Sequence, residues 1–273
     1  MSKHERPSLR IHEPIVKDQI DHIFADLGGN SFLELSPLQR AEKIKKYLEK
    51  LAESRDEATT CDTFLPGVGL VVIKPEAQPI KRIIMKSLQQ MTGVEIVLVN
   101  DTKYTLKTFL AVYGDFLQSP SPEVGVTFPA LLFAGSTSTI TAILFRHLRL
   151  GEYYQLKASQ LPESMFAFPE EENDPQVIFK KLFVGSGDQH PQTLRYQIRL
   201  YLNLLGFGSI DTNLAQSFDI TGELRNRSPE QNLRTFNGLH CPTNTSECLK
   251  QVGIYFDDDQ IKQVMPYFQA SGQ

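Results

Sequence analysis

The most informative segment of the chain is Asn237-Gly238-Leu239-His240-Cys241-Pro242-Thr243-Asn244-Thr245-Ser246-Glu247. The mixed residues 233–239 predict a strand, and the apolar spacing over residues 246–256 predicts a helix. His240 is therefore expected at a strand-to-helix junction, with Asn237 three residues before it. A ring nitrogen there is exposed enough to attack phosphorus, and an amide can hold a hydroxyl or a phosphate oxygen. One histidine near a helix start is weak evidence alone, because most histidines are structural or merely exposed.

A second segment far upstream, Val71-Val72-Ile73-Lys74-Pro75-Glu76-Ala77, strengthens this interpretation. Residues 69–73 form a short apolar, β-branched run that predicts a buried strand, and Lys74-Pro75 ends it. Lys74 is a candidate phosphate contact at the end of that strand. The alternative is an ordinary solvated lysine.

Between and after these segments, predicted strands alternate with predicted helices. The strands cover residues 94–99 and 140–145, and the helices cover residues 80–91, 106–116, 128–133, 176–184 and 193–205. No Gly-rich nucleotide loop is present. The pattern predicts an α+β sandwich with helices on one face of a small sheet.

The N-terminal part predicts a separate helical extension over residues 1–62. An amphipathic helix over 15–27 should end at Gly28-Gly29. A second helix should run from Ser36 to about residue 54, with Ser36 as N-cap, Pro37 in the first turn and Gln39 completing a capping box. The segment Leu27 to Phe32 is also similar to the phosphopantetheine-attachment stretch of carrier proteins. A glycine-capped helix end followed by a loop is the favoured interpretation.

Composition excludes few functions, but it indicates which binding partners and which cellular compartment to expect. The chain has 273 residues, 41% of them hydrophobic, and a net charge of −4, so it is not expected to bind nucleic acid or a membrane surface. No apolar run is long enough for a membrane span, and the polar N-terminus is not expected to be a secretory signal. Three cysteines, an odd number without zinc-type spacing, favour a reducing compartment. We therefore expect a cytoplasmic protein.

The chain resembles the nucleoside diphosphate kinase family. The resemblance depends on residues 73–77, on Asn237 to His240, on Lys181-Leu182-Phe183-Val184-Gly185 followed by Pro191 to Arg195, and on the helix at 246–256. It covers roughly residues 66 to 260, with interruptions. It implies a ferredoxin-like βαββαβ sandwich within a domain spanning residues 63–273, with an insertion at about 196–235.

The family resemblance implies a role for each matching residue at the reaction centre. His240 would take the terminal phosphoryl group of a nucleoside triphosphate and pass it to an acceptor, a nucleoside diphosphate or a related molecule. Lys74 would meet the terminal phosphate and the ribose 3′-hydroxyl, and Asn237 would share that hydroxyl. Tyr113 would lie beside the nucleophile.

Further residues would hold the nucleotide itself. Arg195 would contact the phosphates, as would Lys181 where the family has an arginine, and Phe128 would stack on the base. Mg²⁺ would bind through the nucleotide phosphates, without a metal site of the protein's own. A homo-oligomer is compatible with this resemblance.

The sequence also departs from the family pattern. Cys241 and Pro242 stand where the family has glycine and serine, and Gln251 stands where it has a glutamate that orients the ring. A glutamine oxygen can still accept the ring N–H and fix the tautomer, but it brings no charge. The alternative function is therefore a catalytically weakened nucleotide-binding or scaffold protein of the same fold. An accessory enzyme acting on a specialised nucleotide-like substrate is a third reading.

Two neighbouring features have ordinary explanations. Cys241 beside His240 suggests a Cys–His pair, but adjacent strand residues point to opposite faces of a sheet. The acidic residues 257–259 are expected to form a solvated turn.

Overall fold

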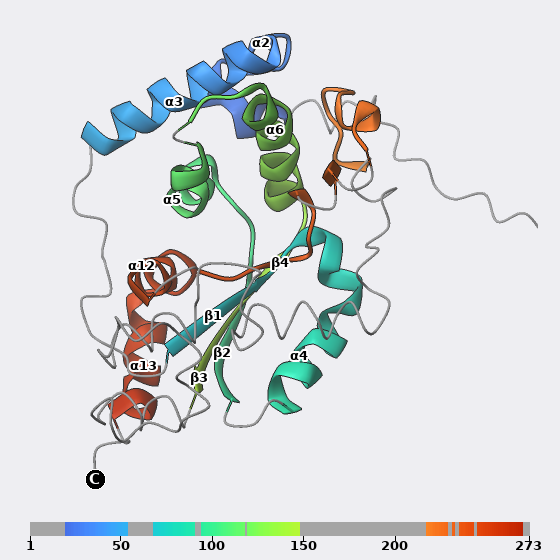
Figure 1. Cartoon of the computed structure of the whole chain (residues 1–273). Coiled ribbons are helices and arrows are strands. Elements are labelled where there is room, and N and C mark those ends of the chain that lie inside the picture. The colour runs from blue at the N-terminus through green and yellow to red at the C-terminus, as the bar shows by residue number, and fades with distance from the viewer. Residues whose placement is uncertain are drawn as a thin grey trace, which may run out of the picture. The chain divides into compact units, whose positions relative to one another are not determined.

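The structure, a computed structural model, describes residues 20–53, 68–90, 94–117, 119–147, 217–228, 231–232, 235–242 and 245–269. The chain forms two compact units (Figure 1). The first contains Met1–Ser54, Lys103–Ser138 and Asp211–Phe236, and the second contains Arg55–Thr102, Thr139–Ile210 and Asn237–Gln273. The boundary at residue 62 stays a prediction, but the N-terminal helices share their unit with two later segments.

The first unit is helical in its described part. After a helical stretch over residues 20–24 come η1 (Ala25–Leu27), α2 (Asn30–Leu33), α3 (Pro37–Glu53), α5 (Leu106–Leu117), α6 (Pro122–Thr137) and η5 (Leu224–Asn226). The predicted capping box is confirmed. The backbone N–H of Gln39 donates to Ser36 Oγ, and the backbone N–H of Ser36 donates to Gln39 Oε1 at 3.0 Å. Gly28, at φ +101°, caps η1 in the left-handed region as expected.

An aromatic cluster forms the core of this unit. Phe24 stacks on Phe32, and both rings meet Phe128 edge-on, as does Phe109 from α5. Helix α6 comes so close to the start of α3 that a Cβ on Gly125 would lie 1.7 Å from the Pro37 carbonyl oxygen. Only glycine fits this crossing.

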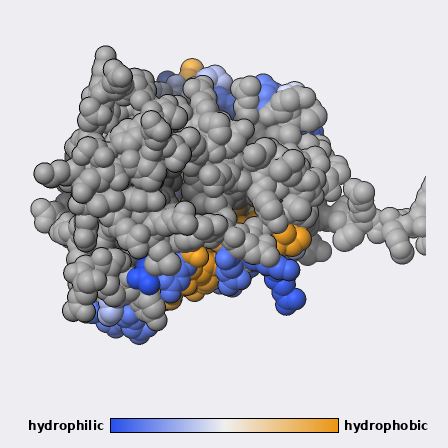
Figure 2. All heavy atoms as spheres, turned by 60° about the horizontal axis from the view of Figure 1, so that its bottom comes forward, coloured by the Kyte–Doolittle hydropathy of each residue, from blue (hydrophilic) through white to orange (hydrophobic). Residues whose placement is uncertain are grey.

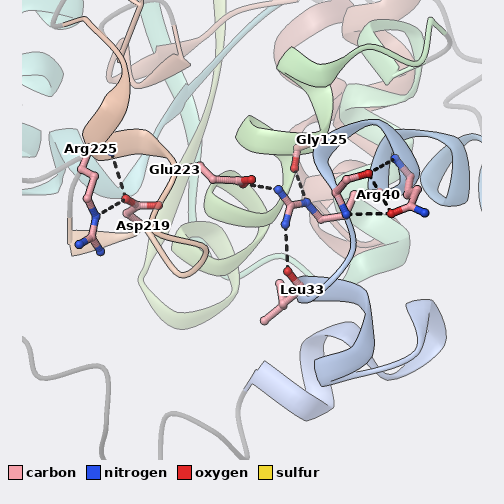
Figure 3. A network of polar contacts seen from close by, with 8 residues as sticks. Leu33, Arg40, Gly125, Asp219, Glu223 and Arg225 are labelled. Carbon is pink, nitrogen blue, oxygen red and sulfur yellow. Dashed lines mark hydrogen bonds and ion pairs between the residues drawn. The ribbon is translucent and has the colours of Figure 1, made fainter.

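Arg40 of α3 is enclosed in the first unit and satisfied by three acceptors (Figure 3). Its guanidinium donates to the Gly125 carbonyl at 2.8 Å, to the Leu33 carbonyl at 2.9 Å, and to the Glu223 carboxylate. A buried charge is tolerated only with such partners. Arg40 therefore ties α3 to α6 and to the segment before η5.

The second unit is built on a four-stranded antiparallel sheet with the order β2-β3-β1-β4. The strands are β1 (Val68–Ile73), β2 (Val94–Thr102), β3 (Ile140–His147) and β4 (Leu239–His240). The helices are η2 (Pro75–Ile80), α4 (Lys81–Gln90), α12 (Thr245–Tyr255) and α13 (Asp258–Gln269). This sheet with its helices, together with the helical first unit, makes the chain an α+β protein.

The two faces of the sheet carry different side chains. Val71, Ile73, Ile143 and Phe145 form a core cluster with Ile84 and Leu88 of α4, joined by Leu239. Because neighbouring strand residues alternate, His240 points to the opposite face, where a side chain of α12 meets it. Helices thus lie on both faces of this sheet, whereas the sequence pattern predicted one.

Few large hydrophobic side chains of the described residues are exposed. On the face drawn in Figure 2, hydrophobic atoms (orange) of the described part show between hydrophilic ones (blue). Leu38 and Ile83 are the large hydrophobic residues classed as exposed in that part. None of the described helices combines the length and the apolar character needed to cross a membrane.

The predicted elements agree with the structure except at four places. Residues Asn30–Leu33, expected to begin a loop, form the short helix α2. The strand expected over 233–239 is limited to Leu239–His240, because the chain before it turns helically, with Phe236 N–H donating to the Asn232 carbonyl. Helix α6 is much longer than the predicted 128–133, since Ser121 caps it and Pro122 fits its first turn. The acidic residues 257–259 open α13, where Asp257 Oδ1 accepts the Gln260 N–H at 2.8 Å. The helices predicted over 176–184 and 193–205 lie outside the described residues.

Candidate functional site

Lys74 and Asn237, 163 residues apart in sequence, meet in the second unit. The Lys74 ammonium donates to Asn237 Oδ1 at 2.9 Å. The backbone continues this contact, because the Lys74 N–H donates to the Gly238 carbonyl at 2.8 Å, just beyond the pairing of β1 with β4. Lys74 is only 6% exposed, so its side chain is held inside the protein and does not extend into solvent.

Glu76 is a part of this site that the sequence analysis did not single out. Its Oε1 accepts the Gly238 N–H at 3.0 Å, although the two residues lie 162 positions apart. Gly238 has φ +74°, the left-handed region that favours glycine. Both backbone polar groups of Gly238 are thus bound to the segment that follows β1. The signal in the sequence was the acidic residue directly after Lys74-Pro75, but no rule of spacing gives it this partner.

The Glu76 carboxyl is almost fully buried, and this changes its acidity. Desolvation raises the pKa of Glu76 above its usual range, while the nearby Lys74 ammonium and the backbone N–H groups of Glu76 and Gly238 act in the opposite direction. Among the described residues, no group forms a hydrogen bond with the second carboxyl oxygen, Oε2. Because desolvation is the largest of these effects, the Glu76 carboxyl is protonated and neutral more readily than the carboxyl of an exposed glutamate.

His240 lies in β4, opposite Val72 of β1, and is partly exposed. Its neighbours Leu239 and Cys241 belong to the core cluster on the α4 face, so His240 and Cys241 point away from each other. The His240 ring faces α12.

A chain of two hydrogen bonds connects His240 to helix α12. His240 Nε2 lies 2.8 Å from Gln251 Oε1, and Gln251 Nε2 donates to Glu247 Oε1, also at 2.8 Å. Gln251 is only 1% exposed, and Glu247 lies one helical turn before it. The contact between His240 and Gln251 is the one that the spacing of eleven residues predicted. Glu247 was not foreseen.

Two predicted site residues belong to the first unit. The Tyr113 ring packs against Phe109, with centroids 4.5 Å apart, and against Tyr104. Phe128 is 1% exposed within the aromatic cluster described above. The expected stacking of Phe128 on a nucleotide base conflicts with this enclosure, because a base needs an open ring face. Phe128 is a core residue, and the role of Tyr113 stays a prediction.

The remaining predicted residues are placed as follows. Lys181 and Arg195 lie outside the described residues. Pro242 is buried directly after Cys241 and supplies neither a hydroxyl nor an N–H. In the described ranges, no three His, Cys, Asp or Glu side chains gather closely enough to hold a metal ion.

Comparison with known proteins gives distant likenesses. No family model matches the chain. No curated protein matches it at a significant level. Among solved structures, it is similar to a nucleoside-diphosphate kinase from Borrelia burgdorferi, described as a transition-state mimic with bound vanadate and ADP, at 14% identity and a TM-score of 0.36, covering 72% of this chain and 91% of that one. It is also similar to an NDP kinase from Pyrobaculum aerophilum at 14% identity and a TM-score of 0.35, covering 72% of this chain and 98% of that one. Similarities this low carry no argument about function, which therefore has to come from the site.

Proposed function

We propose that this chain is a nucleotide-dependent phosphotransferase that passes the terminal phosphoryl group of a nucleoside triphosphate through His240 to an acceptor. The observation that carries the proposal is the hydrogen bond of Lys74 to Asn237, a residue of the segment that also contains His240. An ammonium from one part of the sequence and an amide and an imidazole from another are thus held at one end of β1 and β4. The resemblance of the two segments to those of nucleoside diphosphate kinases supports the same reading.

The reaction would proceed in two phosphoryl-transfer steps. In the first, a nitrogen lone pair of His240 attacks the terminal phosphorus, an N–P bond forms, and the bridging P–O bond breaks to release a nucleoside diphosphate. In the second, a lone pair of an anionic phosphate oxygen of the acceptor attacks the same phosphorus, an O–P bond forms, and the N–P bond breaks with its electron pair returning to the His240 nitrogen. Phosphoryl transfer depends mainly on in-line positioning and on neutralising the phosphate oxygens. Lys74 supplies positive charge for this purpose, and Asn237 supplies an amide for a hydroxyl or phosphate oxygen.

The proposal includes the ferredoxin-like βαββαβ fold of the nucleoside diphosphate kinase type. The antiparallel strand order β2-β3-β1-β4 supports it. Mg²⁺ would be held through the nucleotide phosphates. When bound, the ion would neutralise charge on those phosphates.

A second candidate function keeps nucleotide binding but loses turnover. It is favoured by the hydrogen bond of His240 to Gln251, a neutral amide that cannot stabilise a positive ring as a carboxylate does. The buried Pro242 also removes any hydroxyl from the position two residues after the nucleophile. In this reading, the helices of residues 1–62 would bind a partner protein.

The test is phosphoenzyme formation with γ-labelled ATP and Mg²⁺. We expect an acid-labile, base-stable phosphoenzyme that is absent in His240→Ala and present in the matched control His22→Ala, whose histidine is exposed in the first unit. Chelation of Mg²⁺ should prevent labelling. Equal labelling of wild type and His240→Ala would refute the mechanism. A rise in melting temperature with ATP and no phosphohistidine would select the second candidate.

A further inference from the structure

The hydrogen bonds around Gln251 determine which way its amide is turned. Only the NH₂ group of a glutamine side chain can donate, and the Glu247 carboxylate can only accept. The contact of 2.8 Å between Gln251 Nε2 and Glu247 Oε1 therefore requires the amide nitrogen to face Glu247. The amide oxygen then faces His240, at 2.8 Å from Nε2 of the ring.

The orientation of the amide in turn determines the tautomer of the ring. An amide oxygen is an acceptor, so His240 Nε2 has to carry the proton in this contact. In the neutral ring, the lone pair that can act as a nucleophile is then on Nδ1. If the amide turned over, its NH₂ would face Nε2 and would favour the opposite tautomer, with the lone pair on Nε2.

We propose that Glu247 is a positioning residue which, by holding the amide of Gln251, fixes the Nε2–H tautomer of His240. This inference about the tautomer does not rest on the proposed function. Outer partners of histidine ligands fix tautomers in the same way at metal centres. Here, the glutamine transmits the preference of the carboxylate to the ring.

The simpler explanation is that Glu247 and Gln251 only stabilise α12 as a pair four residues apart on one helix. Burial argues against this. Gln251 is 1% exposed, so both ends of its amide need hydrogen-bond partners inside the protein, and the partner at one end determines what the other end can do. A solvated pair of the same spacing, Lys45 and Glu49 of α3, provides the contrast because both side chains there are exposed.

The tautomer can be measured by ¹⁵N nuclear magnetic resonance of the ring nitrogens, at a pH at which the ring is neutral. The His240 signals are identified by their loss in His240→Ala, among the 6 histidines of the chain. We expect Nε2–H to dominate in the wild type. In Glu247→Ala, we expect the ratio of Nε2–H to Nδ1–H to fall roughly fivefold, the size of one net hydrogen bond.

Two further variants separate this role from a general effect on folding. In Glu247→Ala combined with Gln251→Glu, a carboxylate faces the ring directly and can only accept, so the Nε2–H form should return to the wild-type level. Glu49→Ala, the exposed match on α3, should leave the ratio unchanged. A wild-type ratio in Glu247→Ala overturns the proposal, as does a double variant that fails to recover Nε2–H while its amide spectrum shows a folded chain.

Labelling with γ-³²P ATP distinguishes this inference from the proposed function. If no phosphoenzyme forms in any variant but the tautomer ratio changes as stated, the phosphotransferase proposal fails and the role of Glu247 in fixing the tautomer stands. If labelling depends on His240 while Glu247→Ala leaves the ratio unchanged, the phosphotransferase proposal stands and this inference fails.

Discussion

Replacing Gly238 with alanine should loosen the candidate site by a predictable amount. The residue has φ +74°, and a Cβ in the left-handed region costs about 1–2 kcal/mol. Alanine also restricts the unfolded chain, which offsets about 0.4–1 kcal/mol of that cost. Relaxing the backbone instead would weaken the hydrogen bonds of Gly238 with Lys74 and Glu76, each worth about 1 kcal/mol. After this offset, we expect a net loss of about 0.5–1.5 kcal/mol at this segment.

The loss can be measured by amide hydrogen exchange at Leu239 and His240 in β4. A decrease of about 0.5–1.5 kcal/mol in local stability corresponds to exchange about 2–12 times faster. Because Asn237 precedes this glycine and His240 follows it, phosphoenzyme formation should fall in parallel.

Gly222→Ala is the matched control. Gly222 has a similar angle, φ +78°, but lies in the first unit, where an added Cβ would meet only the flexible end of Arg225 at 3.4 Å. The variant Gly222→Ala should be destabilised to a similar degree around residue 222. Its amide hydrogen exchange in β4 and its phosphoenzyme labelling should equal those of the wild type. Wild-type exchange in Gly238→Ala, or an equal loss of labelling in both variants, would refute the reasoning.

Three further predictions concern buried and paired charges. Because burial raises the pKa of Glu76 above its ordinary 4.5, the folded chain holds this proton more tightly, and wild-type stability should fall as pH rises above about 4.5. Glu76→Gln should lack this fall in urea titrations across pH, and a difference independent of pH would contradict it. The pKa of Asp101 is shifted in the opposite direction. A hydrogen bond from Lys81, and to a smaller extent one from Thr141, lowers it below the ordinary 3.8. Its contribution, under about 1 kcal/mol for so exposed a pair, should be lost as pH falls below that value and be absent in Asp101→Asn. Arg40→Met should cost about 3–5 kcal/mol in thermal unfolding, because it leaves the Glu223 carboxylate and two carbonyl groups without their donor, and a melting temperature like that of the wild type would disprove it.

Local sequence signals predicted most of the described elements, and for identifiable reasons. The run Val68–Ile73 is buried along its whole length, which a continuous apolar, β-branched segment indicates directly. The capping pattern at Ser36 and Gln39 placed the start of α3 within one residue. The same pattern is present at Asp257 and Gln260, although the three consecutive acidic residues there favour a solvated turn. The helix that begins there shows that the cap, rather than the charge, was the informative feature.

The partners of the site residues were harder to predict. Spacing relative to a known pattern led to His240 and Gln251, and the contact is present. Nothing local indicates that Glu76 accepts a hydrogen bond from Gly238, since that pairing exists only after β1 and β4 have come together. Phe128 shows the reverse error. Its place in the order of the family motifs predicts that it stacks on a base, whereas hydrophobic packing places it in a core.

The shortness of β4 explains why these unforeseen partners matter. Only two residue pairs, Val72 with His240 and Ile73 with Leu239, connect β4 to the sheet. Two pairs at the edge of a sheet define the position of a side chain poorly, because ends of strands open readily. The position of His240 therefore depends on contacts outside the ladder, with Glu76 and Lys74 holding the backbone before the ring and Gln251 holding the ring itself. It follows that substitutions at Glu76 or Gln251 should alter His240 more than substitutions among the apolar residues of the core cluster, although none of these partners needs to touch a substrate.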